Sequence, residues 1–285
     1  MTMNNIGPFK LYLNKPNDIC YGSIYTLEVN IPLLYYPKRT VRVFLPEDFD
    51  FNQKYPVLFM SDGQNIVDKY TSAFGAWEID KRQHEFLLEG YKSFIVVGID
   101  CPVRPLERAM EYSFPFIKMN NVEEGRYLKD KNLDFESHLL YEWIARELLP
   151  LIHKYFPISD DRKDIGVGGS SMGGVFALSL ITYYPDLFGF ALSFSPGFFL
   201  YNKKDVKNYL DKAMENFDKD HKLYFYSGNV GFESKFLERT KDMFEYFSSK
   251  GFDEKHLKLC VDLSGEHCEA CWSSHFNDAI KFWED

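Results

Sequence analysis

The strongest constraint on the fold is a regular alternation of short apolar runs with longer stretches of helical periodicity. Parallel strands need a crossover between them, usually a helix, so this alternation is typical of an α/β protein. We expect a mostly parallel sheet of about eight strands with helices on both faces. The expected strands are 21–30, 39–46, 55–61, 93–100, 163–169, 189–195, 222–228 and 256–263.

Apolar residues at helical spacing mark the helices between these runs. A Pro-Lys turn at 37–38 joins the first two strands, which we therefore expect to pair antiparallel. The expected helices are 137–153, 172–183, 234–249 and a last one from about Cys268.

The chain of 285 residues is expected to form a single α/β domain over residues 1–285, because no repeat, low-complexity run or Pro/Ser-rich linker divides it. Residues 1–38 should be an N-terminal strand extension. We expect 101–136 and 197–221 to be loops or a cap near the site, since open α/β sheets build their sites beyond the carboxyl ends of strands.

The charge balance argues against several classes of partner. The chain carries 33 Lys and Arg against 42 Asp and Glu, a net charge of −9, whereas nucleic acid and anionic membrane surfaces require clustered cations. No stretch approaches the roughly 18 consecutive apolar residues of a membrane span, and the N-terminus does not resemble a secretory signal. The five cysteines follow no framework spacing, so we expect a reduced, cytoplasmic protein. The sequence leaves open whether the chain forms a homodimer.

A candidate nucleophile lies in the stretch Gly169-Ser170-Ser171-Met172-Gly173, which matches G-x-S-x-G. Between a strand and a helix, this pattern forms a sharp turn that exposes the serine hydroxyl, and small neighbours two positions away let the strand and helix close. Ser170 is the rival, but the residue two positions after it is Met172, which is too large. The register therefore favours Ser171. A turn that only packs helix on strand is the alternative.

A serine nucleophile needs a base, and in an α/β-hydrolase arrangement the histidine follows the last strand. His267 occupies this position, in Ser264-Gly265-Glu266-His267. His275 falls inside the final helix, and His256 begins the last strand at the wrong end.

The orienting acid should follow the strand 222–228, where Glu233 and Glu238 are the candidates. Glu233 shares the helical phase of Phe236 and Phe244, which face the protein, whereas Glu238 shares a charged face. We favour Glu233. A carboxylate that only complements the helix N-terminus is the alternative reading of Glu233, and a Ser–His dyad without an acid is a further one.

Two backbone amides are expected to form the oxyanion hole. One belongs to Met172, directly after the nucleophile. The other should come from the loop after the third strand, Ser61-Asp62-Gly63-Gln64-Asn65, where Gln64 is the expected donor. A simple Asp-Gly turn is the alternative.

Together these motifs resemble the putative-esterase family of α/β hydrolases, whose relatives include enterochelin, feruloyl and acetyl-xylan esterases, S-formylglutathione hydrolases and mycolyl-transferring antigen 85 proteins. The resemblance implies Ser171, His267 and an acid near Glu233, with the Gln64 and Met172 amides as the oxyanion hole. The stretches that carry it are YPVLFMSDGQN at 55–65, IVVGIDCPVRPLERAMEYS at 95–113, GVGGSSMGGVFAL at 166–178, SFSPG at 193–197 and GEHCEACW at 265–272.

Other polar and aromatic residues near the strand ends have less defined roles. Trp77 and Tyr112 are tentative pocket-lining residues, and Arg104 and Arg108 with Glu111 are expected to order their loop. Cys268 and Cys271 form a CxxC beside His267, but a metal site usually needs a second pair. We expect buried or half-buried helix residues, with a metal or redox role as the alternative, and we expect no metal and no cofactor.

The sequence thus predicts a serine carboxylester hydrolase that acts through an acyl-enzyme. A small acylated carbohydrate, a phenolic ester or a siderophore-type ester is the expected substrate. An acyltransferase using the same acyl-enzyme is the alternative, and a non-catalytic binding protein on the same fold is a third hypothesis, which the intact Ser, His and acid disfavour.

Overall fold

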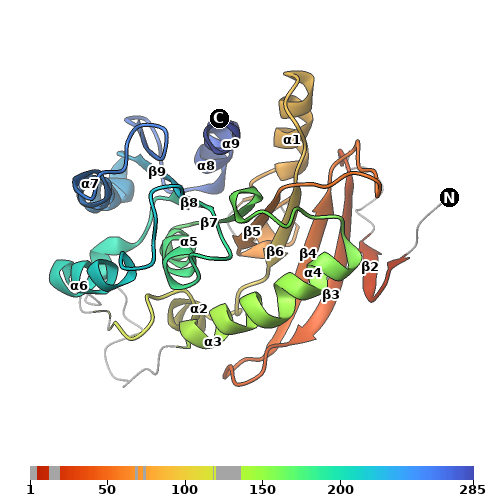
Figure 1. Ribbon diagram of the computed structural model, residues 1–285, viewed down its shortest axis with the longest axis horizontal. Coiled ribbons are helices and arrows are strands. Elements are labelled where there is room, and N and C mark those ends of the chain that lie inside the picture. Colours follow the sequence, from red (N-terminus) through yellow and green to blue (C-terminus); the bar gives the residue numbers. More distant parts are fainter. Residues whose placement is uncertain (1–4, 13–19, 68–69, 73–74, 118, 120–135) are drawn as a thin grey trace.

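Ten strands form one mixed sheet in the order β1-β2-β3-β4-β6-β5-β7-β8-β9-β10 (Figure 1). The computed structural model describes residues 5–12, 20–67, 70–72, 75–117, 119 and 136–285. The strands are β1 (Asn5–Ile6), β2 (Phe9–Tyr12), β3 (Ser23–Asn30), β4 (Lys38–Leu45), β5 (Val57–Ser61), β6 (Ile95–Ile99), β7 (Ile165–Ser170), β8 (Phe190–Phe194), β9 (Lys222–Gly228) and β10 (Leu257–Asp262).

The sheet has a parallel half and an antiparallel half. Strands β5 to β10 run parallel to their neighbours, while β1 to β4 pair antiparallel and β4 joins β6 antiparallel. Every residue of β5, β6, β7 and β8 is buried, as expected of strands covered on both faces.

The expected count of about eight strands is wrong, because β1 and β2 add a short antiparallel hairpin to the edge of β3. These strands have two and four residues. β2 pairs with β3 and β1 pairs with β2, and neither strand carries an apolar run of its own.

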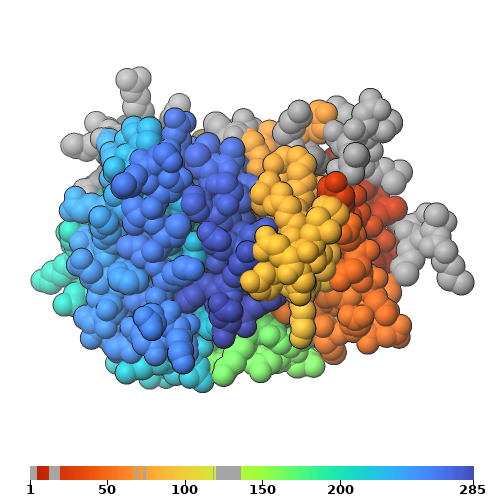
Figure 2. Space-filling model, turned by 90° about the horizontal axis from the view of Figure 1, so that it is seen from above, coloured from red at the N-terminus to blue at the C-terminus, as the bar shows by residue number. Residues whose placement is uncertain are grey.

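The helices cover the sheet in two groups, each enclosing its own apolar core. Figure 1 shows α1, α8 and α9 at the top of the view and α3, α4 and α6 at the bottom. From above, α1 lies beside the C-terminal helices (Figure 2). The helices are α1 (Ile79–Leu88), α2 (Pro105–Glu111), α3 (Ser137–Trp143), α4 (Leu149–Tyr155), α5 (Met172–Tyr183), α6 (Lys203–Ala213), α7 (Ser234–Ser249), α8 (Glu269–Ser274) and α9 (Phe276–Glu284).

Two expected helices depart from regular geometry. Between α3 and α4 the backbone widens into a π-helical turn at Ile144–Leu148, which ends two residues before Pro150. The proline ring cannot fit against the carbonyl four residues earlier. The last helix is interrupted at His275, which separates α8 from α9.

Loops after the parallel strands lie at one edge of the sheet, because parallel strands share their carboxyl ends. The loops after β5, β7, β9 and β10 carry the predicted site residues to this edge. Of the segment 101–136, residues 118 and 120–135 lie outside the described residues, and the segment 197–221 contains α6. In the described parts of the chain, no helix combines the length and apolarity needed to cross a membrane.

Candidate active site

Ser171 occupies a strained turn between β7 and α5. Its φ of 59° and ψ of −119° are rarely adopted by a residue with a side chain. The turn is held on both sides: the Ser171 N–H donates to the carbonyl of Phe194 at 2.9 Å, and its carbonyl accepts from the amides of Gly174 and Gly197, each at 3.1 Å. The strain therefore persists because neighbouring backbone determines it.

The two glycines of the motif are required by close packing. A Cβ at Gly169 would lie 2.7 Å from the Gly173 carbonyl oxygen, and a Cβ at either position would collide with the Ser61 hydroxyl of β5. Only glycine at both positions lets the turn close over β5, which is the physical content of G-x-S-x-G here.

His267 and Glu233 meet across the ends of β9 and β10. His267 Nδ1 lies 2.5 Å from Glu233 Oε2, and the histidine side chain is 21% exposed while the glutamate is fully buried. The ring of Phe236 stacks on the imidazole with centroids 4.4 Å apart. The imidazole is thus fixed in orientation, with Nδ1 directed at the carboxylate.

The second carboxylate oxygen of Glu233 has its own partners. Glu233 Oε1 accepts from the Gly228 amide at 3.1 Å and from the Ser195 hydroxyl. The Ser195 oxygen in turn accepts from the Trp272 indole at 3.0 Å. Since Trp272 supplies the hydrogen to Ser195, the hydroxyl hydrogen of Ser195 is directed at Glu233. Sequence reasoning missed Ser195 and Trp272 in this role, although both lie in the stretches that carry the family resemblance.

The rival candidates lie elsewhere. Glu238 is 80% exposed and lies 3.6 Å from Lys203 on the surface. His275 contacts Asp262 of β10 at 3.2 Å, and His256 contacts Asp253 at 2.6 Å, both away from Glu233.

Gln64 lies in the loop after β5, and β5 pairs in parallel with β7, the strand that leads to Ser171. Neither the Gln64 amide nor the Met172 amide donates a hydrogen bond to any described residue. The Gln64 side chain is held by Cys101, whose amide donates to Oε1 at 3.0 Å. A Cβ at Gly63 would lie 2.6 Å from the Gly98 carbonyl carbon, so glycine is needed for this loop to rest on β6.

An ion pair anchors the start of this loop. Asp62 adopts a left-handed conformation and accepts two hydrogen bonds of 2.7 Å from Arg108 of α2. Arg108 also approaches the Ser170 carbonyl at 3.4 Å, so one guanidinium contacts both the loop and β7. The charge of Asp62 raises the pKa of Arg108 against the opposing effect of burial. Arg108 therefore stays charged.

Comparison with known proteins identifies the family of this chain. Residues 36–281 match the family described as putative esterase. The chain belongs to this family. It is therefore a carboxylic ester hydrolase, and its substrate is a small-molecule ester.

Relatives of this esterase are distant in sequence and close in fold. The uncharacterized protein YbbA of Bacillus subtilis (strain 168) is 20% identical over 254 residues, which cover 86% of this chain and 92% of that protein. A ferulic acid esterase superposes with a TM-score of 0.66 at 16% identity, covering 92% and 98% of the two chains. The enterobactin esterase FES of Shigella flexneri also gives 0.66 at 18% identity, covering 95% of this esterase and 60% of that chain. The fold is that of the α/β hydrolases.

The two tentative pocket residues, Trp77 and Tyr112, are both buried. Trp77 is 1% exposed and packs on Phe194 and Trp272 inside the core. Tyr112 is equally buried, and its hydroxyl accepts from the Asp62 amide at 3.1 Å. Both rings are therefore largely enclosed by protein, and their role in a substrate pocket stays a prediction.

The ion pairs of α2 differ from the expected grouping of Arg104 and Arg108 with Glu111. Arg108 binds Asp62 rather than Glu111, and Glu111 forms a buried pair with Arg39 of β4. Arg104 is 71% exposed and approaches Glu107 at 3.8 Å.

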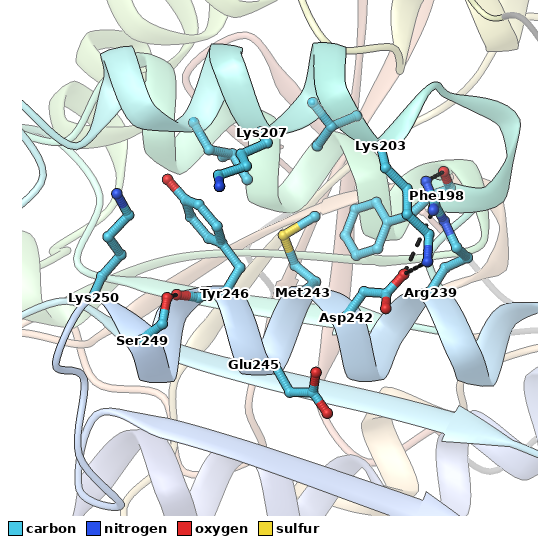
Figure 3. Close-up of a pocket in the computed structure, with 12 residues that line it drawn as sticks. Phe198, Lys203, Lys207, Arg239, Asp242, Met243, Glu245, Tyr246, Ser249 and Lys250 are labelled. Atoms are coloured by element: carbon cyan, nitrogen blue, oxygen red, sulfur yellow. Dashed lines mark hydrogen bonds and ion pairs between the residues drawn. The ribbon is translucent and has the colours of Figure 1, made fainter.

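A cavity of about 480 Å³ lies between α6 and α7, away from the candidate triad (Figure 3). Its floor is apolar, and Figure 3 shows Met243 pointing into the space between the helices while Glu245 points away from α6. Asp242 bridges Lys203 at 2.6 Å and Arg239 at 3.5 Å across its mouth. Among the described residues, no group of three His, Cys, Asp or Glu side chains could hold a metal ion.

Proposed function

We propose that this esterase hydrolyses carboxylic esters through a triad of Ser171, His267 and Glu233. The observation that carries the proposal is the 2.5 Å contact of His267 Nδ1 with the buried carboxylate of Glu233. A carboxylate in this position fixes the imidazole tautomer with the hydrogen on Nδ1, which leaves Nε2 free to accept a proton. No hydrogen bond joins the Ser171 hydroxyl to a described side chain, and in apo structures this link is often open until substrate binds.

In the proposed mechanism, the Ser171 hydroxyl attacks the ester carbonyl carbon while His267 Nε2 takes its proton. The negative charge that develops on the carbonyl oxygen is stabilised by the backbone amides of Gln64 and Met172. The alcohol then leaves with the proton from His267. Water, activated by the same imidazole, releases the acid from the serine.

The substrate class we propose is a small acylated carbohydrate, a phenolic ester or a siderophore-type ester. Support comes from the folds of the neighbours, which include a ferulic acid esterase and an enterobactin esterase. A panel of aryl, sugar and serine-lactone esters, assayed with and without an added alcohol, would rank these substrates and separate hydrolysis from acyl transfer.

The triad is tested by active-site labelling with a fluorophosphonate, which reacts only with an activated serine. Mass spectrometry should place the label on Ser171, and Ser171→Ala should lower kcat for p-nitrophenyl acetate by a factor on the order of 10⁶. Ser170→Ala is the matched control, because Ser170 is the buried neighbour at the end of β7. Its activity should stay near that of the wild type. More than about a tenth of wild-type activity in Ser171→Ala would contradict the proposal.

We also propose a reducing, cytoplasmic setting. All five cysteines are free thiols, and disulfides are rare in the cytosol because glutathione and thioredoxin keep thiols reduced. Fractionation of the native cells, followed by alkylation of free thiols in the purified esterase, tests this setting.

A further inference from the structure

Two cysteines of this esterase lie in contact beside the candidate triad. Cys268 Sγ and Cys271 Sγ are 3.3 Å apart, and both side chains are half-buried. A disulfide bond is about 2.05 Å long, so the sulfurs would have to approach by about 1.2 Å. Cys271 lies in α8, and Cys268 is the residue directly before this helix. A change in the side-chain angles of the two cysteines can supply that movement.

We propose that Cys268 and Cys271 are a site of reversible oxidation, whose disulfide lowers the esterase activity by displacing His267. The regulatory part of this proposal rests on the triad proposed above, whereas the disulfide itself does not.

The disulfide would affect His267 and Glu233 because each cysteine is adjacent in sequence to a residue of the site. Cys268 follows His267 in the chain, and Cys271 precedes Trp272. Trp272 packs edge-on against the imidazole with centroids 4.9 Å apart, and it holds Ser195, which holds Glu233. A disulfide would therefore displace His267 through Cys268. It would also displace Trp272, which supports Glu233 through Ser195, by way of Cys271.

The backbone just before Cys268 is hydrogen-bonded to the Cys271 sulfur. The Glu266 amide donates to Cys271 Sγ at 3.3 Å, and the Cys268 amide donates to the Glu266 carbonyl at 3.0 Å. His267 lies between these two hydrogen bonds. Movement of the Cys271 sulfur into a disulfide weakens the first of them, so the turn that presents His267 has to rearrange.

The oxidant we assign is a small-molecule disulfide such as oxidised glutathione. A thiolate of Cys268 attacks one sulfur of glutathione disulfide, which forms a mixed disulfide and expels one glutathione thiolate. Cys271 then loses its proton and attacks the Cys268 sulfur, which expels the second glutathione. Two electrons and two protons pass from the cysteine pair to two molecules of glutathione. Burial raises the pKa of the Cys271 thiol, so it is the poorer first nucleophile.

The expected loss of activity is large because a shift of about 1 Å in a catalytic group can cost on the order of 10²-fold in rate. We expect kcat to fall by at least about tenfold on oxidation and to return fully with dithiothreitol.

The experiment equilibrates the full chain in glutathione buffers of graded redox potential. Alkylation and mass spectrometry should show the five free thiols of the reduced protein becoming three, with the linkage between Cys268 and Cys271. Activity on p-nitrophenyl acetate and the ring-proton NMR signals of His267, assigned with His267→Asn, are followed in the same samples. Cys268→Ser/Cys271→Ser should be insensitive to oxidation. Cys20→Ser is the matched control and should respond like the wild type.

Five free thiols throughout the oxidised series would overturn the proposal. It is equally overturned if the disulfide forms and either the His267 signals or the activity stays at the level of the reduced enzyme. If the reduced protein hydrolyses no ester, the triad proposal fails, while the thiol count and the His267 signals still decide whether the disulfide forms and moves His267.

Discussion

Replacement of Glu233 by glutamine tests the base–acid pair most directly. The carboxylate is fully buried and its oxygens have different partners: Oε1 accepts from Gly228 and Ser195, and Oε2 faces His267 Nδ1. In Glu233→Gln the amide oxygen should take the Oε1 position, because both partners there are donors. The amide NH₂ then faces Nδ1, which must accept, so the imidazole hydrogen moves to Nε2.

An imidazole with its hydrogen on Nε2 cannot accept the serine proton. We therefore expect kcat to fall by roughly 10²–10⁴, which corresponds to about 3–5 kcal/mol of transition-state stabilisation. KM should change little, since Glu233 is buried beneath the histidine. The free energy of unfolding should fall by less than about 1.5 kcal/mol, because the amide keeps the shape and two of the three hydrogen bonds and reverses the direction of the third.

The assay is steady-state hydrolysis of p-nitrophenyl acetate, with urea unfolding of the same preparations. Glu238→Gln is the control: this side chain is 80% exposed, so kcat should change less than about twofold. A folded Glu233→Gln enzyme with more than about a third of wild-type kcat would refute the role of the acid. The esterase would then work as a Ser171–His267 dyad. The reverse order of effects would assign the acid to Glu238.

Three further predictions concern the support of the site. Arg108→Met should cost about 3 kcal/mol of unfolding free energy and lower kcat, because it leaves Asp62 buried without its partner; exposed Arg104→Met should do neither, and equal effects in urea unfolding and kinetics would contradict the anchoring role. Hydrogen bonds with Cys260 and Asp262 raise the pKa of His275 to about 9. The protonated ring therefore stabilises the fold, and this contribution is fully present below the ordinary histidine pKa of about 6.5 and is lost as pH rises through 9. His275→Gln should thus cost about 1 kcal/mol at pH 6 and little at pH 10 after allowance for solvent screening; a pH-independent difference in urea unfolding would oppose this. Activity should survive dialysis against EDTA, because the proposed triad needs no Lewis acid, and loss of turnover that zinc restores would count against it.

The sequence alone predicted strands β3 to β10, the helical segments around α3–α4, α5, α7 and α8–α9, and the register of the candidate nucleophile. Apolar periodicity depends on which face of an element is buried, and that information is local, so α5 and α7 were predicted with the bounds they have in the structure. The G-x-S-x-G pattern around Ser171 is visible in the sequence, although the contacts that hold the turn come from Phe194, Gly197 and Ser61 in other segments. Glu233 was favoured over Glu238 from helical phase, and the structure buries the first and exposes the second.

Tertiary structure decided which distant groups meet. The sequence places Trp77 and Tyr112 on loops near strand ends, and only the structure shows that both rings are buried. The partner of Arg108 is Asp62, 46 residues away, and no local pattern specifies that choice. The contact from Trp272 through Ser195 to Glu233 joins three segments of the chain. Such pairings depend on the folded packing of the whole sheet, in which burial makes an unpaired polar group costly, and so only the structure determines them.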